Sequence, residues 1–358
     1  MLKSETSEIY KSDASAQATD IQRLSSNGRG HKNLVARALA VARSTVLTGA
    51  VFATLALASC SDSNEPDGPT LGSAPVVVSV SVDTAMTAFT TFDSESRAAD
   101  SYALRLQVQA IDERDHLLAS DTRIIHPGQP LTAQFNFTLP SGKHHLLAWA
   151  DYVDDTTSPT DLYYHTTDLT DITFAGDTYV GDTDWRNAYA ATAPVEFKVY
   201  QGDTTTVIHS DLSLRSVMGK VRFVATDYNQ WLPTAQSLRT LVSYTGFLPN
   251  HYSVLRGVPF DSTTGVSFLT AMRDGDVNSG TVTLAEDLVM VNGDEGNVQV
   301  AIGLYDDDGK LFSRSQVLTV PLRRGGVTTV TGHFLTKTAS AGGIGIDPSF
   351  GGDININI

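Results

Sequence analysis

Residues 74–82 read APVVVSVSV, and this stretch decides the fold class of the chain. One face carries every second residue, and these residues are Val76, Val78, Val80 and Val82. The opposite face carries Ser79 and Ser81. Because successive side chains of a strand point to opposite sides, this alternation predicts a strand with one face buried.

The chain that follows repeats this kind of pattern in short hydrophobic segments. Three polar turns separate segments that we expect to pair as hairpins, and they lie at Asp112–Asp115, Pro140–Lys143 and Asp306–Gly309. Long runs of Ala, Leu, Glu and Lys at helical spacing are absent, whereas Thr, Val, Asp and Gly are abundant. The sequence therefore predicts an all-β fold.

Composition divides the chain into four parts. We expect a leader with a signal peptide at 1–59, a flexible acidic tether at 60–73, and β-sandwich domains at 74–210 and 211–358. Each of the last two parts is long enough to bury a core of its own. The residues around the Asp112 turn resemble those around the Asp306 turn, as two related sandwiches would.

The leader ends in an apolar run at 44–59, which basic residues precede. A positive segment followed by a short apolar segment and small residues is typical of a secretory signal peptide. The run is short for a helix that must cross about 30 Å of hydrocarbon. The next residue, Cys60, is the only cysteine in the chain, so an internal disulfide is excluded.

Leu57-Ala58-Ser59-Cys60 resembles the lipobox of bacterial lipoproteins. That resemblance implies cleavage just before Cys60 and fatty acylation of its thiol, with palmitate as one such acyl group. The lipid would attach the protein to the outer membrane. The alternative is an ordinary signal peptide followed by a chance cysteine.

The charge of the chain is acidic. Lys and Arg number 25 and Asp and Glu number 40, which gives a net charge of −15. The leader is basic, so the remaining chain is more acidic still. Such a surface repels phosphate backbones, and we expect no nucleic-acid partner.

No catalytic motif emerges from residue spacing. The chain lacks His-Glu-x-x-His, Gly-x-Ser-x-Gly, a phosphate-binding loop and a cysteine pair for zinc. An unrecognised hydrolase would rest only on the presence of Ser, His and Asp. We therefore expect no enzymatic activity and no cofactor.

Two acidic groups and one aromatic group have alternative interpretations. The acidic groups are Asp306, Asp307 and Asp308, and Asp177, Asp182 and Asp184. Calcium prefers several oxygen ligands, but neither spacing matches a known calcium loop, so we expect solvated turns and no metal. The aromatic residues Trp149, Trp185, Trp231, Tyr163 and Tyr164 would suit sugar stacking, but core packing is the simpler expectation.

Several segments, taken in order, resemble the fimbrillin-like lipoproteins of Bacteroidales, the type V pilin-like fimbrial subunits. These segments are Leu139–Lys143 leading into Ala148–Asp154, Tyr163-Tyr164, Asp168-Leu169, and Leu212–Arg215 leading into Gly219–Val221. Arg97-Ala98 after the first strand and the Gly-rich tail ending in Asp353–Ile358 agree with this resemblance.

The resemblance implies two tandem transthyretin-like, Greek-key β-sandwich domains in a surface fimbrium. In polymerising members a trypsin-like protease cuts after an arginine and removes the first strand, and a neighbouring subunit donates a strand to the groove. Here the cut would fall between Arg97 and Ala98 and release the strand of Val76, Val78, Val80 and Val82. The donated strand would be the tail, in which Ile354, Ile356 and Ile358 alternate with polar residues.

We therefore expect a stalk, anchor or minor subunit of a fimbrium at the outer membrane and cell surface. Its partners would be other fimbrial subunits or copies of itself. The alternative is a surface glycan-binding lipoprotein that works beside an outer-membrane transporter.

Overall fold

The computed structural model describes residues 69–84, 102–176, 178–232, 237–273 and 275–336, together with the backbone at 345–346 and 354–357. These residues belong to one compact unit of the chain, 65–358. Apart from η2 (Asp184–Arg186) and α3 (Tyr228–Trp231), the regular structure of the described part is β. The all-β prediction is confirmed. No helix within these ranges is long and apolar enough to cross a membrane.

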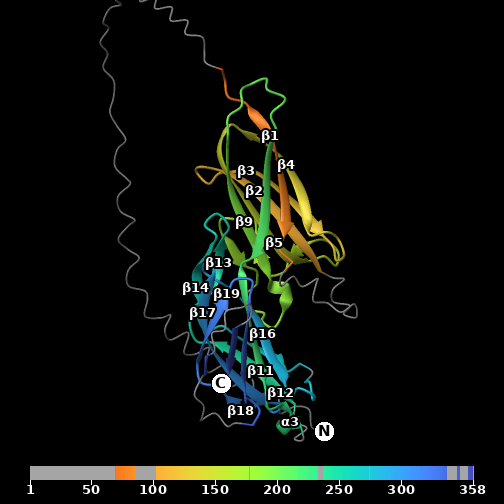
Figure 1. Ribbon diagram of the computed structural model, residues 1–358, viewed down its shortest axis with the longest axis vertical. Coiled ribbons are helices and arrows are strands. Elements are labelled where there is room, and N and C mark those ends of the chain that lie inside the picture. The colour runs from red at the N-terminus through yellow and green to blue at the C-terminus, as the bar shows by residue number, and fades with distance from the viewer. Residues whose placement is uncertain are drawn as a thin grey trace, which may run out of the picture. The chain divides into compact units, whose positions relative to one another are not determined.

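The first large sheet has eight strands. They are β1 (Ser73–Val82), β2 (Tyr102–Asp112), β3 (Leu117–Ile125), β4 (Thr132–Pro140), β5 (Gly142–Asp154), β6 (Thr160–Asp161), β9 (Ala188–Phe197) and β10 (Ile208–Ser216). Their order is β3-β2-β5-β9-β10-β1-β4, and β6 pairs with the end of β5. Figure 1 shows β1, in orange, beside β4.

This sheet folds over on itself at β10. Residues 208–214 of β10 pair with β1, whereas Arg215 and Ser216 pair with β9. The strands β10, β1 and β4 thus form one layer and β3, β2, β5 and β9 form the other. Apolar side chains from both layers fill the space between them, and they include Val78, Leu106, Phe135, Ala148 and Leu212. The arrangement is a β-sandwich.

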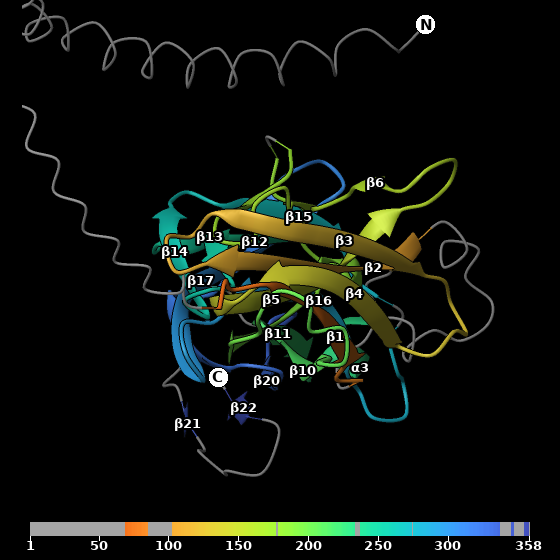
Figure 2. The ribbon, with the colours of Figure 1, turned by 90° about the horizontal axis from the view of Figure 1, so that it is seen from above.

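Two five-stranded sheets enclose a second core. The first has the order β16-β11-β20-β22-β21, from β11 (Met218–Ala225), β16 (Val282–Met290), β20 (Val327–Gly332), β21 (Gly345–Ile346) and β22 (Ile354–Asn357). The second has the order β15-β12-β17-β18 with β19 also on β17, from β12 (Leu238–Tyr244), β15 (Ser267–Ala271), β17 (Glu295–Asp306), β18 (Leu311–Arg314) and β19 (Leu318–Arg323). Figure 2 shows β22 and β21 beyond β20 at the edge of the first of these sheets.

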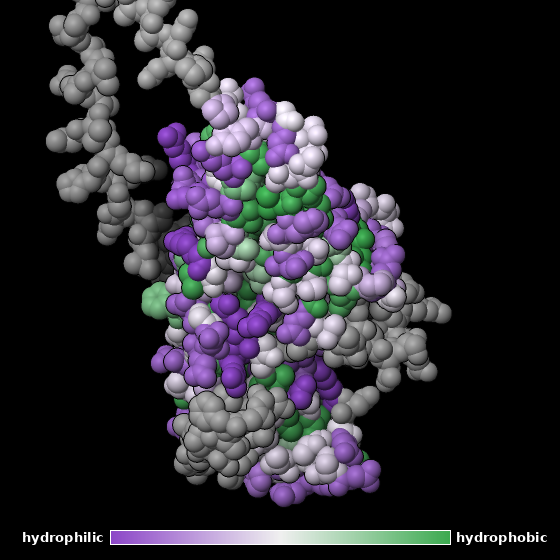
Figure 3. Space-filling model, turned by 45° about the horizontal axis from the view of Figure 1, so that its top comes forward, coloured by the Kyte–Doolittle hydropathy of each residue, from purple (hydrophilic) through white to green (hydrophobic). Residues whose placement is uncertain are grey.

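A small fourth sheet combines strands from both halves of the chain. Its order is β14-β13-β8-β7, from β7 (Tyr164–His165), β8 (Ile172–Phe174), β13 (Leu248–Ser253) and β14 (Val258–Thr263). A third apolar cluster joins it to the large sheets through Trp149, Ile172, Tyr252 and Leu288. Figure 3 shows that hydrophobic residues also reach the surface between hydrophilic ones on the face in view.

Some predicted strand limits differ from those observed. The domain boundary expected at 210/211 falls inside β10, and the chain enters the next sheet only at Met218. β10 begins only at Ile208, because Asp203 accepts hydrogen bonds from the backbone N–H groups of Thr205 and Thr206 and holds a turn there. These contacts are local side-chain caps, which compete with strand pairing.

The chain that returns after the Asp306 turn is divided into β18 and β19. Ser315 lies between them, where its N–H donates to Ile302 O and its Oγ accepts from Ile302 N.

The Asp112 and Asp306 turns share one hydrogen-bond pattern. Asp112 Oδ1 accepts from the backbone N–H groups two and four residues later, at 2.8 and 2.9 Å. Asp306 Oδ1 does the same at 3.1 and 2.8 Å. A register shift precedes each turn. The likeness between these hairpins in sequence therefore extends to their geometry.

Candidate functional site

Strand β1 occupies the middle of the layer formed by β10, β1 and β4. Residues 76–82 pair in parallel with β10, and residues 73–81 pair antiparallel with β4. Val76 and Val78 are fully buried, and Val80 and Val82 are 2% and 7% exposed. β1 therefore uses both edges of its backbone and one whole face of its side chains.

The beginning of β1 is fastened by a cluster of backbone contacts. Gly72 N donates to Val199 O at 2.9 Å, and the Ser141 hydroxyl lies 2.9 Å from both Gly72 O and Val199 O. A Cβ on Gly72 would lie 3.0 Å from the backbone of Tyr200, so this close approach requires glycine.

The end of β1 is fastened by two backbone hydrogen bonds. Val82 N donates to Leu131 O at 3.0 Å, and Asp83 N donates to Leu214 O at 2.9 Å. The chain between Thr84 and Tyr102 lies outside the described residues, and it contains the predicted cleavage pair Arg97 and Ala98. Cys60 and Ile358 also lie outside the described residues.

The outer face of this layer is polar. A hollow of about 690 Å³ lies over β1, β4 and β10, and hydroxyl and amide side chains such as Ser81, Thr132, Gln134 and Ser213 line it. Among the described strands β4 pairs only with β1. Loss of β1 would consequently leave β4 without a partner and expose the inner face that Phe135 and Leu212 share with the valines.

The predicted tail residues Ile354 and Ile356 lie in β22. Their backbone pairs in parallel with β20, with Ile354 opposite Thr328 and Ile356 opposite Val330. β21 pairs with the other edge of β22. The tail is therefore a strand in a sheet of its own chain.

A buried ion pair that sequence reasoning missed links β2 to β5. Arg105 Nε and Nη2 donate to the two carboxylate oxygens of Asp151 at 2.9 and 2.7 Å, and Nη1 donates to Asp161 at 2.6 Å. Asp151 is fully buried. Burial outweighs the nearby guanidinium and raises the pKa of Asp151 to about 6.

A second buried cluster links η2 and the segment before it to β16. Arg186 Nη1 donates to Asp287 Oδ1 at 3.1 Å, and Nη2 donates to Leu288 O at 2.7 Å. The hydroxyls of Tyr179 and Tyr244 both donate to Asp287 Oδ2 at 2.7 Å. Burial raises the pKa of Asp287 although Arg186 lowers it.

A more exposed charge network continues along the same strand. Glu286 contacts Lys220 and Arg273 at 3.5 and 2.9 Å and also pairs with Arg222. Asp182 Oδ1 accepts from Glu286 N at 2.8 Å, and Asp184 pairs with Lys220 at 2.6 Å. These carboxylates serve contacts within the protein.

The calcium interpretation gains no support. Asp306 caps its own turn, and Asp177 lies outside the described residues. Within the described ranges, no group of three or more His, Cys, Asp and Glu side chains is placed to hold a metal ion.

Four of the five aromatic residues considered for sugar stacking are core residues. Trp149 and Tyr164 are fully buried, and Trp185 and Trp231 are 7% and 6% exposed. Tyr163 alone of this group lines a pocket, where Phe174 and Tyr179 join it.

The sequence did contain a signal for the missed ion pairs. A charged residue inside an apolar strand, such as Arg105 or Asp151, requires a partner when it is buried.

Three solved structures are similar to the chain in backbone. A putative cell adhesion protein from Bacteroides eggerthii has 13% identity and a TM-score of 0.41, with 81% of this chain and 98% of that chain covered. The fimbrial anchor protein Mfa2 from Porphyromonas gingivalis has 15% identity and a TM-score of 0.38, with 67% and 82% covered. A putative polysaccharide binding protein (DUF1812) from Bacteroides thetaiotaomicron has 14% identity and a TM-score of 0.41, with 67% and 79% covered.

No curated protein matches the chain. One family profile does, and its match spans residues 69–358, from the residues just before β1 to the end of the tail. The chain belongs to this family, which is described as a family of unknown function (DUF6562).

Proposed function

We propose that the chain is a structural subunit of a surface fimbrium, exported as a lipoprotein and assembled by strand exchange. Its role would be structural and not enzymatic. The sequence resemblance to fimbrillin-like lipoproteins supports the role in a fimbrium. The placement of β1 supports assembly by strand exchange.

The single observation that carries this role is that β1 lies between β10 and β4 and contributes one continuous strand to the layer. A cut after Arg97 would break the covalent link between β1 and β2. From then on, β1 would be held only by backbone pairing and by the packing of its valines. The groove left behind would present unpaired N–H and C=O groups and an apolar floor, which one incoming strand can satisfy at once.

Cys60 would attach the subunit to the outer membrane through its lipid. If Arg97 is cut, the mature chain begins at Ala98 and leaves the lipid behind with β1, as a polymerising stalk subunit would. If Arg97 stays intact, the lipid and β1 remain and the subunit is an anchor or minor subunit. We propose two transthyretin-like domains of the Greek-key type as the scaffold in either case.

The tail is the proposed donor. Residues 351–358 would leave β20 and enter the groove of a neighbour, where the face of Ile354, Ile356 and Ile358 would replace the valine face of β1. This exchange needs no new type of contact, because β22 already forms a strand. Deletion of 351–358 should block incorporation into fibres and leave a folded monomer.

The first test is the N-terminal sequence of the protein recovered from sheared surface fibres and from the outer membrane. Ala98 as the first residue would identify a polymerising subunit, and acylated Cys60 would identify an anchor or minor subunit. Absence of the protein from both fractions would contradict the fimbrial role.

The second test fixes β1 in place in a chain that is processed at Arg97. Ser79 and Gln134 face each other across β1 and β4, and opposed residues of antiparallel strands are close enough for a disulfide. The pair Ser79→Cys and Gln134→Cys should prevent fibre formation when oxidised and restore it when reduced. The matched control is Gln299→Cys with Thr319→Cys across β17 and β19, which should assemble in both states. Equal assembly of the oxidised β1 variant would show that β1 does not leave.

A further inference from the structure

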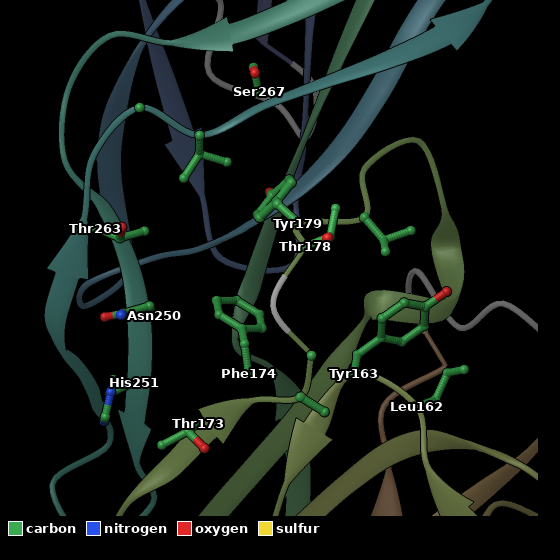
Figure 4. Close-up of a pocket in the computed structure, with 15 residues that line it drawn as sticks. Leu162, Tyr163, Thr173, Phe174, Thr178, Tyr179, Asn250, His251, Thr263 and Ser267 are labelled. Carbon is green, nitrogen blue, oxygen red and sulfur yellow. The ribbon is translucent and has the colours of Figure 1, made fainter. Parts of the chain in front are cut away.

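A pocket of about 530 Å³ lies beside the small fourth sheet. Its walls come from two stretches of chain, residues 162–180 and residues 250–267. Figure 4 shows Phe174 and Tyr179 between Asn250 and Thr263 on one side and Tyr163 on the other. None of these contacts enters the proposed exchange of β1.

The described side chains that line the pocket are almost all uncharged, although the chain as a whole carries −15, and Asp177, between the wall residues Gly176 and Thr178, lies outside the described residues. The described residues of its wall include no Lys, Arg, Asp or Glu. Its one imidazole, His251, lies 2.8 Å from Asp171 Oδ1, so a carboxylate already faces that ring. A charged ligand would meet no opposite charge among these side chains, whereas a neutral ligand does not need one.

The aromatic wall is held rigidly from behind. The Arg186 guanidinium lies 4.0 Å from the ring centre of Tyr179 and 5.4 Å from that of Phe174. The Tyr179 hydroxyl is fixed by its bond to Asp287, and its ring stacks on Phe268 at 6.1 Å. The charge of Arg186 is neutralised by its ion pair with Asp287. The rings therefore present apolar, preformed faces to the pocket.

Polar groups surround these aromatic faces. The hydroxyls of Thr173, Thr178, Thr263 and Ser267 line the pocket. The Asn250 amide also lies in the wall, and its buried Oδ1 has no hydrogen-bond partner among the described residues. A buried amide oxygen without a partner is unusual, and rotation of the amide would offer either of its polar atoms to a ligand.

We propose that this pocket binds a neutral saccharide, with a sugar ring against Tyr163, Phe174 and Tyr179 and its hydroxyls on Asn250 and the threonine side of the wall. A sugar ring has one apolar face and a rim of hydroxyl groups, which matches aromatic faces surrounded by neutral donors and acceptors. Sialylated and uronic sugars are disfavoured because the wall offers their carboxylates no cation. The site is independent of the assembly role and would give the subunit a binding activity of its own.

The test uses the full chain with Cys60→Ser, which prevents acylation. The probes are neutral trisaccharides of glucose, galactose and mannose, with sialyllactose as the charged probe, and binding is measured by calorimetry. At least one neutral probe should bind, with a Kd that does not change between about 50 and 500 mM NaCl because no charge is screened. Tyr163→Ala and Asn250→Ala should each weaken binding about threefold to tenfold, as expected for one lost contact.

The matched control is Phe247→Ala, which removes an aromatic side chain that is 75% exposed and lies outside the pocket wall. Its Kd should equal that of the unsubstituted chain. Thermal unfolding of each variant verifies that the fold is intact. Failure of every neutral probe to bind, preferential binding of sialyllactose, or unchanged affinity in folded Tyr163→Ala and Asn250→Ala variants would overturn the assignment.

Discussion

Arg186 and Asp287 form an ion pair that joins η2 to strand β16, and both side chains are almost completely buried. The carboxylate also accepts from Tyr179 and Tyr244, and the guanidinium also donates to Leu288 O. Both carboxylate oxygens of Asp287 and both terminal nitrogens of Arg186 are thus hydrogen-bonded inside the protein, whereas the buried Arg186 Nε has no partner among the described residues. A change to either partner leaves the other charged and buried.

Asp287→Asn should lower the free energy of unfolding by about 3–5 kcal/mol, because it leaves Arg186 without its counter-charge in a buried site. Urea unfolding followed by tryptophan fluorescence measures this loss. The control is Asp171→Asn, which removes a half-exposed partner of His251 and should cost about 0–1 kcal/mol. Equal losses in the two variants would mean that burial of the Arg186 pair does not matter to stability.

Asp151 should make stability depend on pH in an uncommon direction. Its pKa is about 6 in the folded protein and 3.8 as the reference value, so the folded state binds a proton that the unfolded state does not. Stability should therefore rise as the pH falls from about 7 to about 4, by at most about 3 kcal/mol at about 1.4 kcal/mol per pKa unit. The measurement is the unfolding free energy of the unsubstituted chain minus that of Asp151→Asn across this range.

Asp161 provides a control of opposite sign in the same cluster. Hydrogen bonds and charge from His165 and Arg105 lower its pKa despite partial burial. The stability it contributes is present above the ordinary aspartate pKa and is lost as the pH falls through the lowered value. A difference curve for Asp161→Asn that rises toward low pH, as that of Asp151→Asn should, would contradict the lowered pKa of Asp161.

Gly219 permits a close approach between β11 and the end of β19. A Cβ there would lie 2.9 Å from Arg323 O and 3.0 Å from Val291 Cγ2. Gly219→Ala should therefore destabilise the fold by about 1–3 kcal/mol through overpacking. Gly246→Ala is the matched control, since its nearest neighbour would lie at 3.6 Å, and thermal unfolding of the two variants should separate clearly.

Val78→Ala should weaken the hold on β1. Val78 is fully buried against Phe135 across the strand pair, and its truncation removes about 2 kcal/mol of apolar burial. In protein cut once between Thr84 and Tyr102, the β1 peptide should dissociate faster than it does from the unsubstituted chain cut in the same way. Mass spectrometry of the released peptide measures this rate. Ser81→Ala changes an exposed side chain of the same strand and should leave the release rate unaltered.

The sequence predicted those elements whose signal is local. The valine face of residues 74–82 alternates without interruption, and its burial follows from that pattern alone. The turns at Asp112 and Asp306 were equally plain, because an Asp that caps its own turn acts within four residues. These local rules do not depend on where the rest of the chain lies.

The sequence did not predict features that depend on distant partners. Arg186 and Asp287 are 101 positions apart, and the residues around each give no signal that identifies the other as its partner. The pairing of β8 with β13, which builds one wall of the pocket, likewise joins segments of different halves. Leu212 and Leu214 lie in the part of the chain expected to form the second domain, but they pack in the first core because β10 continues to Ser216.

The register of β1 also has a consequence for the order of events during synthesis. Val78 lies beside Ser210, so the first described strand finds its parallel partner only after β2 to β9 have been made. β4 is made earlier, but it lies at the edge of the sheet and pairs there with β1, so β1 and β4 both reach the rest of the sheet through β10. Closing so long a loop makes the pairing of β1 with β10 late. The first described strand therefore joins its sheet late, and this joining is the step that the proposed assembly would reverse.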